Sequence, residues 1–118
     1  MGPLKSDWQP KSDQEMSIVV NESSSALPLL RDEELLKTKS QLFKALGDET
    51  RIRIIGILKI QESCLCELVA GLKIPSSTLT HHLQILERSG IIRSRKEKKF
   101  TLFSLVQNHK LDLYLELV

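Results

Sequence analysis

Residues 75–105, PSSTLTHHLQILERSGIIRSRKEKKFTLFSL, decide the fold. The first half predicts a helix that begins at Ser76, because serine is a favoured N-cap, and that stops at Gly90, because glycine favours the end of a helix. Apolar or ring side chains recur along this helix at spacings of three, four and seven, which predicts one buried face. That face would carry Leu79, His82, Leu83 and Leu86.

The opposite face of the same helix is made of hydrogen-bonding side chains. Most of them are short enough to let a helix lie close to base edges in a major groove. We therefore predict that this helix reads DNA and that its first half faces the duplex. The residues assigned to DNA contact here are Ser76, Ser77, Thr78, Thr80, His81 and Gln84.

After Gly90 the pattern changes from helical to extended. Residues 91–95 and the alternating Phe100, Leu102 and Ser104 predict two antiparallel strands, joined by a basic turn at residues 96–99. Such a hairpin suits phosphates and the minor groove, and the residues assigned to that contact are Arg93, Arg95, Lys96, Lys98 and Lys99.

The charge of the chain is segregated. Residues 76–99 carry a net charge of +4, whereas the whole chain carries +2 and residues 1–36 carry −4. A basic body of this kind favours a polyanionic partner. It argues against the alternative of a protein-interaction module that binds no DNA.

Three helical segments precede this region. The first begins near Arg31 and ends at Gly47; the second, capped by Asp48, would be nearly buried, with Arg51 and Arg53 as its polar positions. The third covers about residues 63–72, and a turn of three residues, 73–75, joins it to the Ser76 helix, which is the spacing of a helix-turn-helix. A last helix is expected at residues 106–118. The fold class predicted is mainly α with a small β-hairpin, a winged helix-turn-helix.

The chain divides by composition into two parts. Residues 1–30 mix polar residues with isolated apolar ones and predict a disordered tail, whereas residues 31–118 predict one DNA-binding domain. The first and last helices of that domain have a surplus of leucine, which predicts a homodimer formed through them. We find neither a signal peptide nor a stretch for a membrane span, and expect a cytoplasmic protein.

Two cysteines, Cys64 and Cys66, stand one residue apart. We expect thiols, because a bridge across a single residue would be strained. On a regular helix two such side chains point about 200° apart, so both sulfurs reach one ion only if Cys64 precedes the first turn or that turn unwinds. Spacing alone leaves metal binding and simple packing open. For His82 we expect a hydrogen-bonded core position rather than a ligand.

Four ordered motifs resemble the ArsR/SmtB family of winged-helix repressors. FKALGDETRIRII at residues 43–55 resembles the opening signature of that family, and CLCEL at 64–68 its metal-binding box. SSTLTHHL at 76–83 resembles its recognition helix, and SGII at 89–92 the entry to its wing. The resemblance covers about residues 35–117.

The resemblance implies a homodimeric repressor that binds a palindromic operator in double-stranded DNA and releases it when a soft metal or metalloid binds. The ligands would be Cys64 and Cys66, and the ion arsenite, cadmium, lead or zinc. A third family cysteine has no counterpart, because Val69 stands at its position. Two alternatives remain open: a thiol-based redox regulator, and a regulator without a metal. An enzyme is not expected, since no nucleophile, base and acid fall in a catalytic arrangement.

Overall fold

The N-terminal part of the chain contains a helix where the sequence predicted a disordered tail. The computed structural model describes residues 7–106 and 109–116, and it divides into two units, Met1–Lys37 and Thr38–Val118. Helix α1 (Asp13–Ala26) begins with a capping box, in which Ser12 and Glu15 each accept a hydrogen bond from the other's backbone N–H. These local bonds explain the helix, because none of its side chains is buried.

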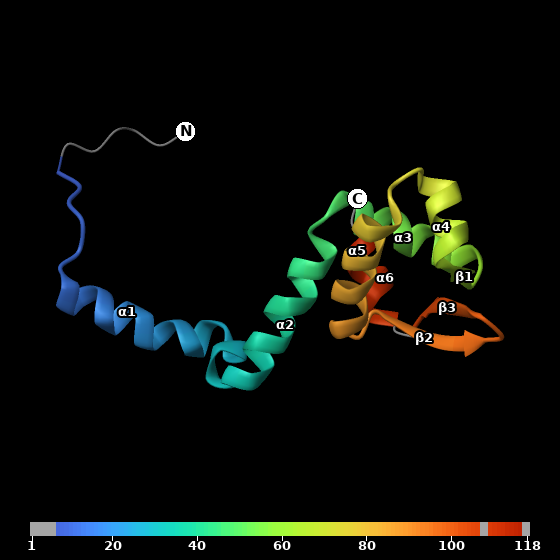
Figure 1. Ribbon diagram of the computed structural model, residues 1–118. Coiled ribbons are helices and arrows are strands. Elements are labelled where there is room, and N and C mark those ends of the chain that lie inside the picture. Colours follow the sequence, from blue (N-terminus) through green and yellow to red (C-terminus); the bar gives the residue numbers. More distant parts are fainter. Residues whose placement is uncertain (1–6, 107–108, 117–118) are drawn as a thin grey trace. The chain divides into compact units, whose positions relative to one another are not determined.

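Helix α2 (Glu33–Leu46) follows a short 3₁₀ turn, η1 (Pro28–Arg31). Asp32 caps it, since Asp32 Oδ1 accepts from the Leu35 backbone N–H at 3.0 Å. Helix α3 (Glu49–Ile60) begins after Asp48, which accepts from the Arg51 N–H at 3.1 Å as the sequence predicted. Figure 1 shows the order of these elements.

The face that α3 buries differs from the prediction. Arg51 is buried at 9% exposure, whereas Ile52 is 43% exposed and Ile60 is 85% exposed. The guanidinium is buried because it finds acceptors: it donates to the Ala45 carbonyl at 2.7 Å and to the Lys44 carbonyl at 3.1 Å. The last carbonyls of α2 have no partner within the helix, and the hydrogen bonds that they accept from Arg51 allow this arginine to be buried.

The helix-turn-helix has the predicted spacing. Helix α4 (Leu65–Leu72) and helix α5 (Ser76–Arg88) are joined by residues 73–75. The predicted N-cap is one residue late: α5 begins at Ser76, its N-cap is Pro75, and the Pro75 carbonyl accepts from the Leu79 N–H at 3.1 Å. The Ser76 hydroxyl is therefore not used in a cap.

Gly90 ends α5 in a complete Schellman motif. Its φ is +77°, a left-handed conformation that glycine adopts without a steric penalty. The Ile91 N–H donates to the Leu86 carbonyl and the Gly90 N–H to the Glu87 carbonyl, both at 3.0 Å. The chain then turns directly into the first strand of the wing.

The sheet has three strands among the described residues rather than the two predicted, and its order is β1-β3-β2. Strands β2 (Ile92–Glu97) and β3 (Phe100–Leu105) form the expected antiparallel hairpin. The added strand β1 (Ser63–Cys64) lies in the segment that the sequence assigned to a helix. Leu102 on β3 is the register partner of Cys64 on β1 and of Arg95 on β2.

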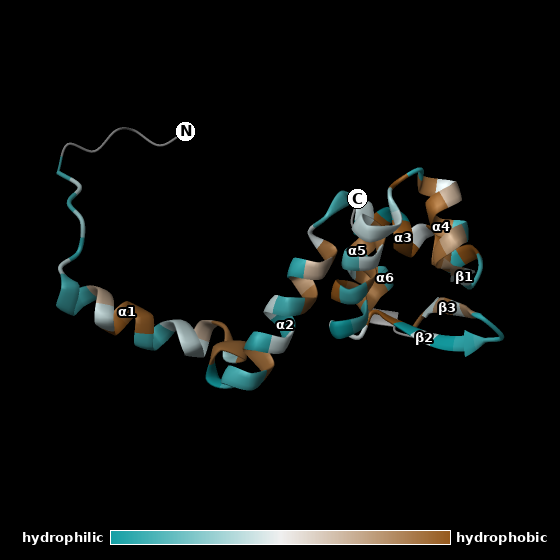
Figure 2. Ribbon diagram, in the orientation of Figure 1, coloured by the Kyte–Doolittle hydropathy of each residue, from teal (hydrophilic) through white to brown (hydrophobic). Residues whose placement is uncertain are grey.

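The hydrophobic core lies among α2, α3, α4, α5 and the start of β2. Its largest fully buried side chains include Ile54, Leu68, Leu79 and Leu86. Helix α6 (His109–Leu115) lies within the predicted 106–118 and adds Leu111 to this core. Val106 and Glu116 are not helical, and residues 107–108 and 117–118 of that prediction lie outside the described residues. Figure 2 shows that the outer strand β2 is almost entirely hydrophilic, in contrast to α4. In the part of the chain that the structure describes, no helix has the length and apolar character to cross a membrane.

Candidate nucleic-acid interface and cysteine pair

Helix α5 presents a continuous polar face to solvent. The three apolar residues Leu79, Leu83 and Leu86 are buried against the core. The residues assigned to DNA contact on this helix are all exposed: Ser76, Ser77, Thr78, Thr80, His81 and Gln84. The two faces of the predicted helix are thus separated as its periodicity required.

His82 is the hydrogen-bonded, largely buried residue that was predicted. Its side chain is 14% exposed, and its Nδ1 lies 3.1 Å from Arg51 Nη1. A guanidinium only donates, so Nδ1 must accept and the proton of the neutral ring must lie on Nε2. This contact joins α3 to α5, and no sequence pattern indicated that Arg51 is the partner of His82.

Asp48 completes this junction. Its carboxylate accepts a hydrogen bond from the Arg51 backbone N–H, and this bond lowers the pKa of Asp48 below its usual value. Desolvation of the carboxylate opposes the shift in part. Its Oδ1 also lies 3.9 Å from His82 Nδ1. One short acidic side chain therefore both caps α3 and faces the imidazole of α5.

The wing exposes most of its positive charge. Arg93, Lys96, Lys98 and Lys99 are exposed, and Lys99 Nζ lies 5.6 Å from the centre of the Phe100 ring. The turn itself is Lys98-Lys99, shorter than the predicted 96–99, and Lys98 adopts a left-handed φ of +56°. Figure 1 shows the hairpin extending away from the C-terminal end of α5.

Arg95 differs from the other basic residues of the wing. Its guanidinium donates to both carboxylate oxygens of Glu62, at 2.9 and 2.7 Å, and to Glu97 at 2.7 Å. The hydrogen bond with Arg95 lowers the pKa of Glu62, and the bonds with Glu62 and Glu97 raise the pKa of Arg95. Two acids thus neutralise the charge that the sequence assigned to phosphate contact. Glu62 immediately precedes β1, so the bridge ties β1 to the wing.

Cys64 and Cys66 are joined by a disulfide, which corrects the expectation of two thiols. Their Cα atoms are 5.4 Å apart, within the ordinary range for a bridge. The expectation of strain rested on the single residue between the two cysteines. Cys64 lies in extended backbone as the N-cap of α4. Its side chain therefore leaves the helix direction and reaches Cys66. Cys64 is buried and Cys66 is exposed.

Both carboxylate oxygens of Glu67 accept hydrogen bonds beside the cysteine pair. Its Oε1 accepts from the Cys64 N–H at 3.0 Å, and its Oε2 accepts from Gln61 Nε2 at 3.3 Å. Across residues 7–106 and 109–116, no three histidine, cysteine or carboxylate side chains gather in a way that could hold a metal ion. The chain thus supplies at most a pair of sulfur ligands here.

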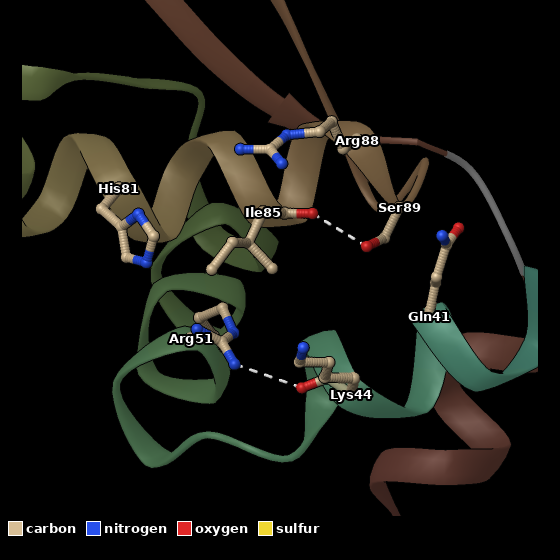
Figure 3. A pocket seen from close by; sticks show the side chains of 7 residues that line it. All are labelled: Gln41, Lys44, Arg51, His81, Ile85, Arg88 and Ser89. Atoms are coloured by element: carbon tan, nitrogen blue, oxygen red, sulfur yellow. Dashed lines mark hydrogen bonds between the residues drawn. The ribbon is translucent and has the colours of Figure 1, made fainter.

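A pocket of about 540 Å³ lies between α2 and α5 and was not foreseen from the sequence. Its lining is Gln41, Lys44, Arg51, His81, Ile85, Arg88 and Ser89. Figure 3 shows His81, Ile85 and Arg88 along α5, with Lys44 and Gln41 on α2 across the space. His81 and Arg88 share an edge of α5 because they are seven residues apart, about two helical turns.

The chain resembles bacterial regulators in sequence. Residues 48–94 match the family described as "Bacterial regulatory protein, arsR family". An HTH-type transcriptional regulator of Methanocaldococcus jannaschii is 37% identical over 76 residues, which are 64% of this chain and 85% of that protein. A cadmium resistance transcriptional regulatory protein CadC homolog of Staphylococcus aureus is 37% identical over 71 residues, 59% of each chain. The chain spans 58% of the length of a third relative, a transcriptional repressor SmtB homolog of Synechocystis sp. that is 35% identical over 77 residues.

The fold has solved counterparts. HlyU from Vibrio cholerae N16961 superposes with a TM-score of 0.62 at 28% sequence identity, over 72% of this chain and 91% of that chain. The sequence match to the family begins at Asp48, the cap of α3, and ends within β2. It therefore contains the helix-turn-helix, the cysteine pair and the first half of strand β2.

Proposed function

The chain belongs to the ArsR family of bacterial transcriptional regulators, and on that premise we propose that it is a repressor that binds an operator in double-stranded DNA as a homodimer. The observation that carries the proposal is the exposed polar face of α5 beside a wing with five exposed basic residues, of which Arg95 alone is ion-paired among the described residues. In a winged helix-turn-helix, the second helix enters the major groove and reads base edges.

The proposal divides the DNA contacts between two elements. Thr80 and Gln84 on α5 would read bases, while Lys98 and Lys99 at the tip of the wing would bind phosphates. Replacing both lysines with glutamine should weaken binding to every duplex and reduce the salt dependence. Replacing Gln84 with alanine should instead change the preferred sequence, at about 1–3 kcal/mol per lost base contact.

The test uses a duplex selected by the protein from a random pool, and a scrambled duplex as control. Affinities of wild type and both variants are measured by fluorescence anisotropy at several salt concentrations. Equal losses on the two duplexes from both variants would contradict this division. Failure of the wild type to bind either duplex at low salt would contradict DNA binding itself.

Exposed apolar side chains support a dimer formed through α2 and α6. Phe43 is 49% exposed and Leu113 is 68% exposed, and the Phe43 ring meets the Tyr114 ring edge to face at 5.2 Å. A second copy would cover such side chains. Leu113→Glu should yield a folded monomer in sedimentation velocity, whereas the exposed Ile60→Glu should leave the dimer intact.

A thiophilic metal or metalloid is the inducer we propose, held by the reduced forms of Cys64 and Cys66. The name of the staphylococcal relative, a cadmium resistance regulator, supports a metal response. Thiolates prefer soft ions, so arsenite, cadmium, lead and zinc are the candidates. Cys64 precedes α4 as its N-cap, which supports convergence of the two sulfurs on one ion. A further ligand would come from water, an external thiol or a second protomer.

Oxidation is the second candidate, favoured by the disulfide itself. Two thiols would lose two electrons and two protons to an oxidant such as hydrogen peroxide, which is reduced to two molecules of water. Cys66 is exposed and is therefore the sulfur that an oxidant reaches. Metal binding and oxidation would both act on the sulfur atoms of Cys64 and Cys66.

A route from this site to the DNA-binding elements supports control by either event. Cys64 pairs with Leu102 on β3, and Leu102 pairs with Arg95 in the wing. Helix α4, which Cys64 caps, also precedes the recognition helix by three residues. Movement at Cys64 would therefore act on the wing and on α5 together.

One experiment separates the two candidates. The reduced protein is titrated without oxygen with arsenite, cadmium, lead and zinc, following thiolate charge-transfer absorbance, beside a Cys64→Ser, Cys66→Ser double variant. A cysteine-dependent signal that accompanies DNA release supports the metal response. No signal, together with peroxide-driven release that a reductant reverses, supports the redox response. A double variant that responds like wild type contradicts both.

A further inference from the structure

The pocket between α2 and α5 concentrates positive charge without a carboxylate. Its lining includes two cationic side chains from different helices, Lys44 on α2 and Arg88 on α5, and the imidazole of His81 (Figure 3). No aspartate or glutamate lines it. Ile85 contributes the apolar part of the wall. A cavity with this lining favours an anion over a neutral or cationic ligand.

A buried charge strengthens this preference. Arg51 lines the pocket at 9% exposure, and its hydrogen bonds go to two backbone carbonyls and to His82 Nδ1, which are all neutral acceptors. Within the described residues, neither Lys44 nor Arg88 forms an ion pair. Three cationic groups therefore border one space. The Asp48 carboxylate interacts electrostatically with Arg51 but accepts a hydrogen bond from its backbone N–H and not from the guanidinium, and an anion that entered the pocket would interact with all three cationic groups.

We propose that this pocket binds a phosphate group. Arg88 offers a planar fork that matches two phosphate oxygens, and Lys44 offers a point charge from the other side. The Gln41 amide can donate as well. Ser89 is not a donor to the ligand, because its hydroxyl donates to the Ile85 carbonyl at 2.8 Å.

The position of the pocket favours a backbone phosphate of DNA as the source, an inference that rests on the proposed function. His81 and Arg88 lie on the edge of α5 that faces α2. On another edge of α5, Glu87 accepts a hydrogen bond from Ser94 of the wing at 2.8 Å. Recognition helix α5 would then have phosphate-binding groups on both sides, the wing on one and Lys44 with Arg88 on the other. Gln84 would be held between them against the bases.

The experiment compares single charge deletions within one helix. Lys44→Gln removes a pocket charge, and Lys37→Gln removes an exposed charge of α2 that does not line the pocket. Binding to a selected duplex is measured over a range of potassium chloride. Lys44→Gln and Arg88→Gln should each lower the slope of log affinity against log salt by about 0.9, the loss of one phosphate contact. Lys37→Gln should leave it unchanged.

A second arm asks whether a free phosphate occupies the site. Wild type and Lys44→Gln are titrated with inorganic phosphate at constant ionic strength, and the ring resonances of His81 are followed by NMR. Shifts that saturate in wild type and vanish in Lys44→Gln, with an unchanged salt slope, support the phosphate site with a free phosphate as its ligand. Slope changes without such shifts support the DNA backbone.

Two results together would overturn the inference. Lys44→Gln and Arg88→Gln would show the same slope of log affinity against log salt as the wild type, and the His81 resonances of the wild type would not respond to phosphate. Thermal unfolding of each variant shows whether it is folded, and both side chains are exposed, so folding should be retained. If the wild type bound no duplex, the proposed function would fail, and the phosphate titration alone would decide the pocket.

Discussion

Arg51 closes the corner between α2 and α3 at the scale of a single residue. Arg51→Met would keep the volume but leave two backbone carbonyls and the His82 ring without their donor. Buried acceptors without partners cost about 1–3 kcal/mol each, so the free energy of unfolding should fall by at least about 2 kcal/mol. Urea denaturation followed by circular dichroism measures the change.

Arg53 provides the matched control on the same helix. It is exposed and forms only an i, i+4 ion pair with Glu49 at 3.0 Å. Such surface pairs contribute about 0.3–0.5 kcal/mol. Equal losses for Arg51→Met and Arg53→Met would contradict the structural role given to the Arg51 network.

Gly90 and Gly56 should respond to alanine in opposite directions. Gly90 has φ +77° in the Schellman motif, where a Cβ is strained, so Gly90→Ala should destabilise the fold by about 1–2 kcal/mol. Gly56 lies inside α3, and an added Cβ meets nothing within 4 Å. Gly56→Ala should therefore stabilise it by about 0.5–1 kcal/mol. Thermal unfolding of the two variants checks the signs, and the same sign for both would refute this account.

The wing, at the scale of an element, contains basic residues of two kinds. Arg95 is neutralised by Glu62 and Glu97, whereas Lys98 at the turn has no ion pair among the described residues. Lys98→Gln should lower the salt slope of DNA binding by about 0.9, and Arg95→Gln by clearly less. Anisotropy titrations measure both. If Arg95→Gln lowered the slope as much as Lys98→Gln, the Glu62 bridge would have to open on DNA.

Local patterns predicted the elements better than the contacts between them. The period of leucines in 76–88 and the glycine at position 90 specified α5 and its end, since both signals act within a few residues. Arg51 is held by two carbonyls six and seven residues before it and by the more distant His82. The third strand β1 depends on a partner far along the chain. So does the pocket, because Lys44 and Arg88 come from different helices. The disulfide was missed for a local reason: one residue in extended backbone changed the direction of Cys64.

The whole chain divides into a unit that holds the core and one that does not. Neither α1 nor η1 buries a side chain. A protein that begins at Asp32 keeps the cap of α2, and we expect it to unfold at the same urea midpoint as the full chain, within experimental error. A midpoint shifted by more than the equivalent of about 1 kcal/mol would show that residues before Asp32 stabilise the domain.

Linkage between the two proposed sites gives a last prediction for the molecule as a whole. If cadmium bound at Cys64 and Cys66 lowers operator affinity by some factor, operator DNA must lower cadmium affinity by the same factor, because the coupling free energy is a property of the complete cycle. Couplings of this kind are typically about 1–3 kcal/mol, or five- to 150-fold. Cadmium titrations of the reduced protein with and without saturating duplex measure one side, and DNA titrations with and without cadmium measure the other.

Unequal factors would mean that a further species, such as a dissociated monomer or the disulfide form, takes part in the cycle. If both factors were close to one, there would be no coupling free energy between cadmium binding at the cysteine pair and DNA binding. Cys64 would then serve only as the N-cap of α4.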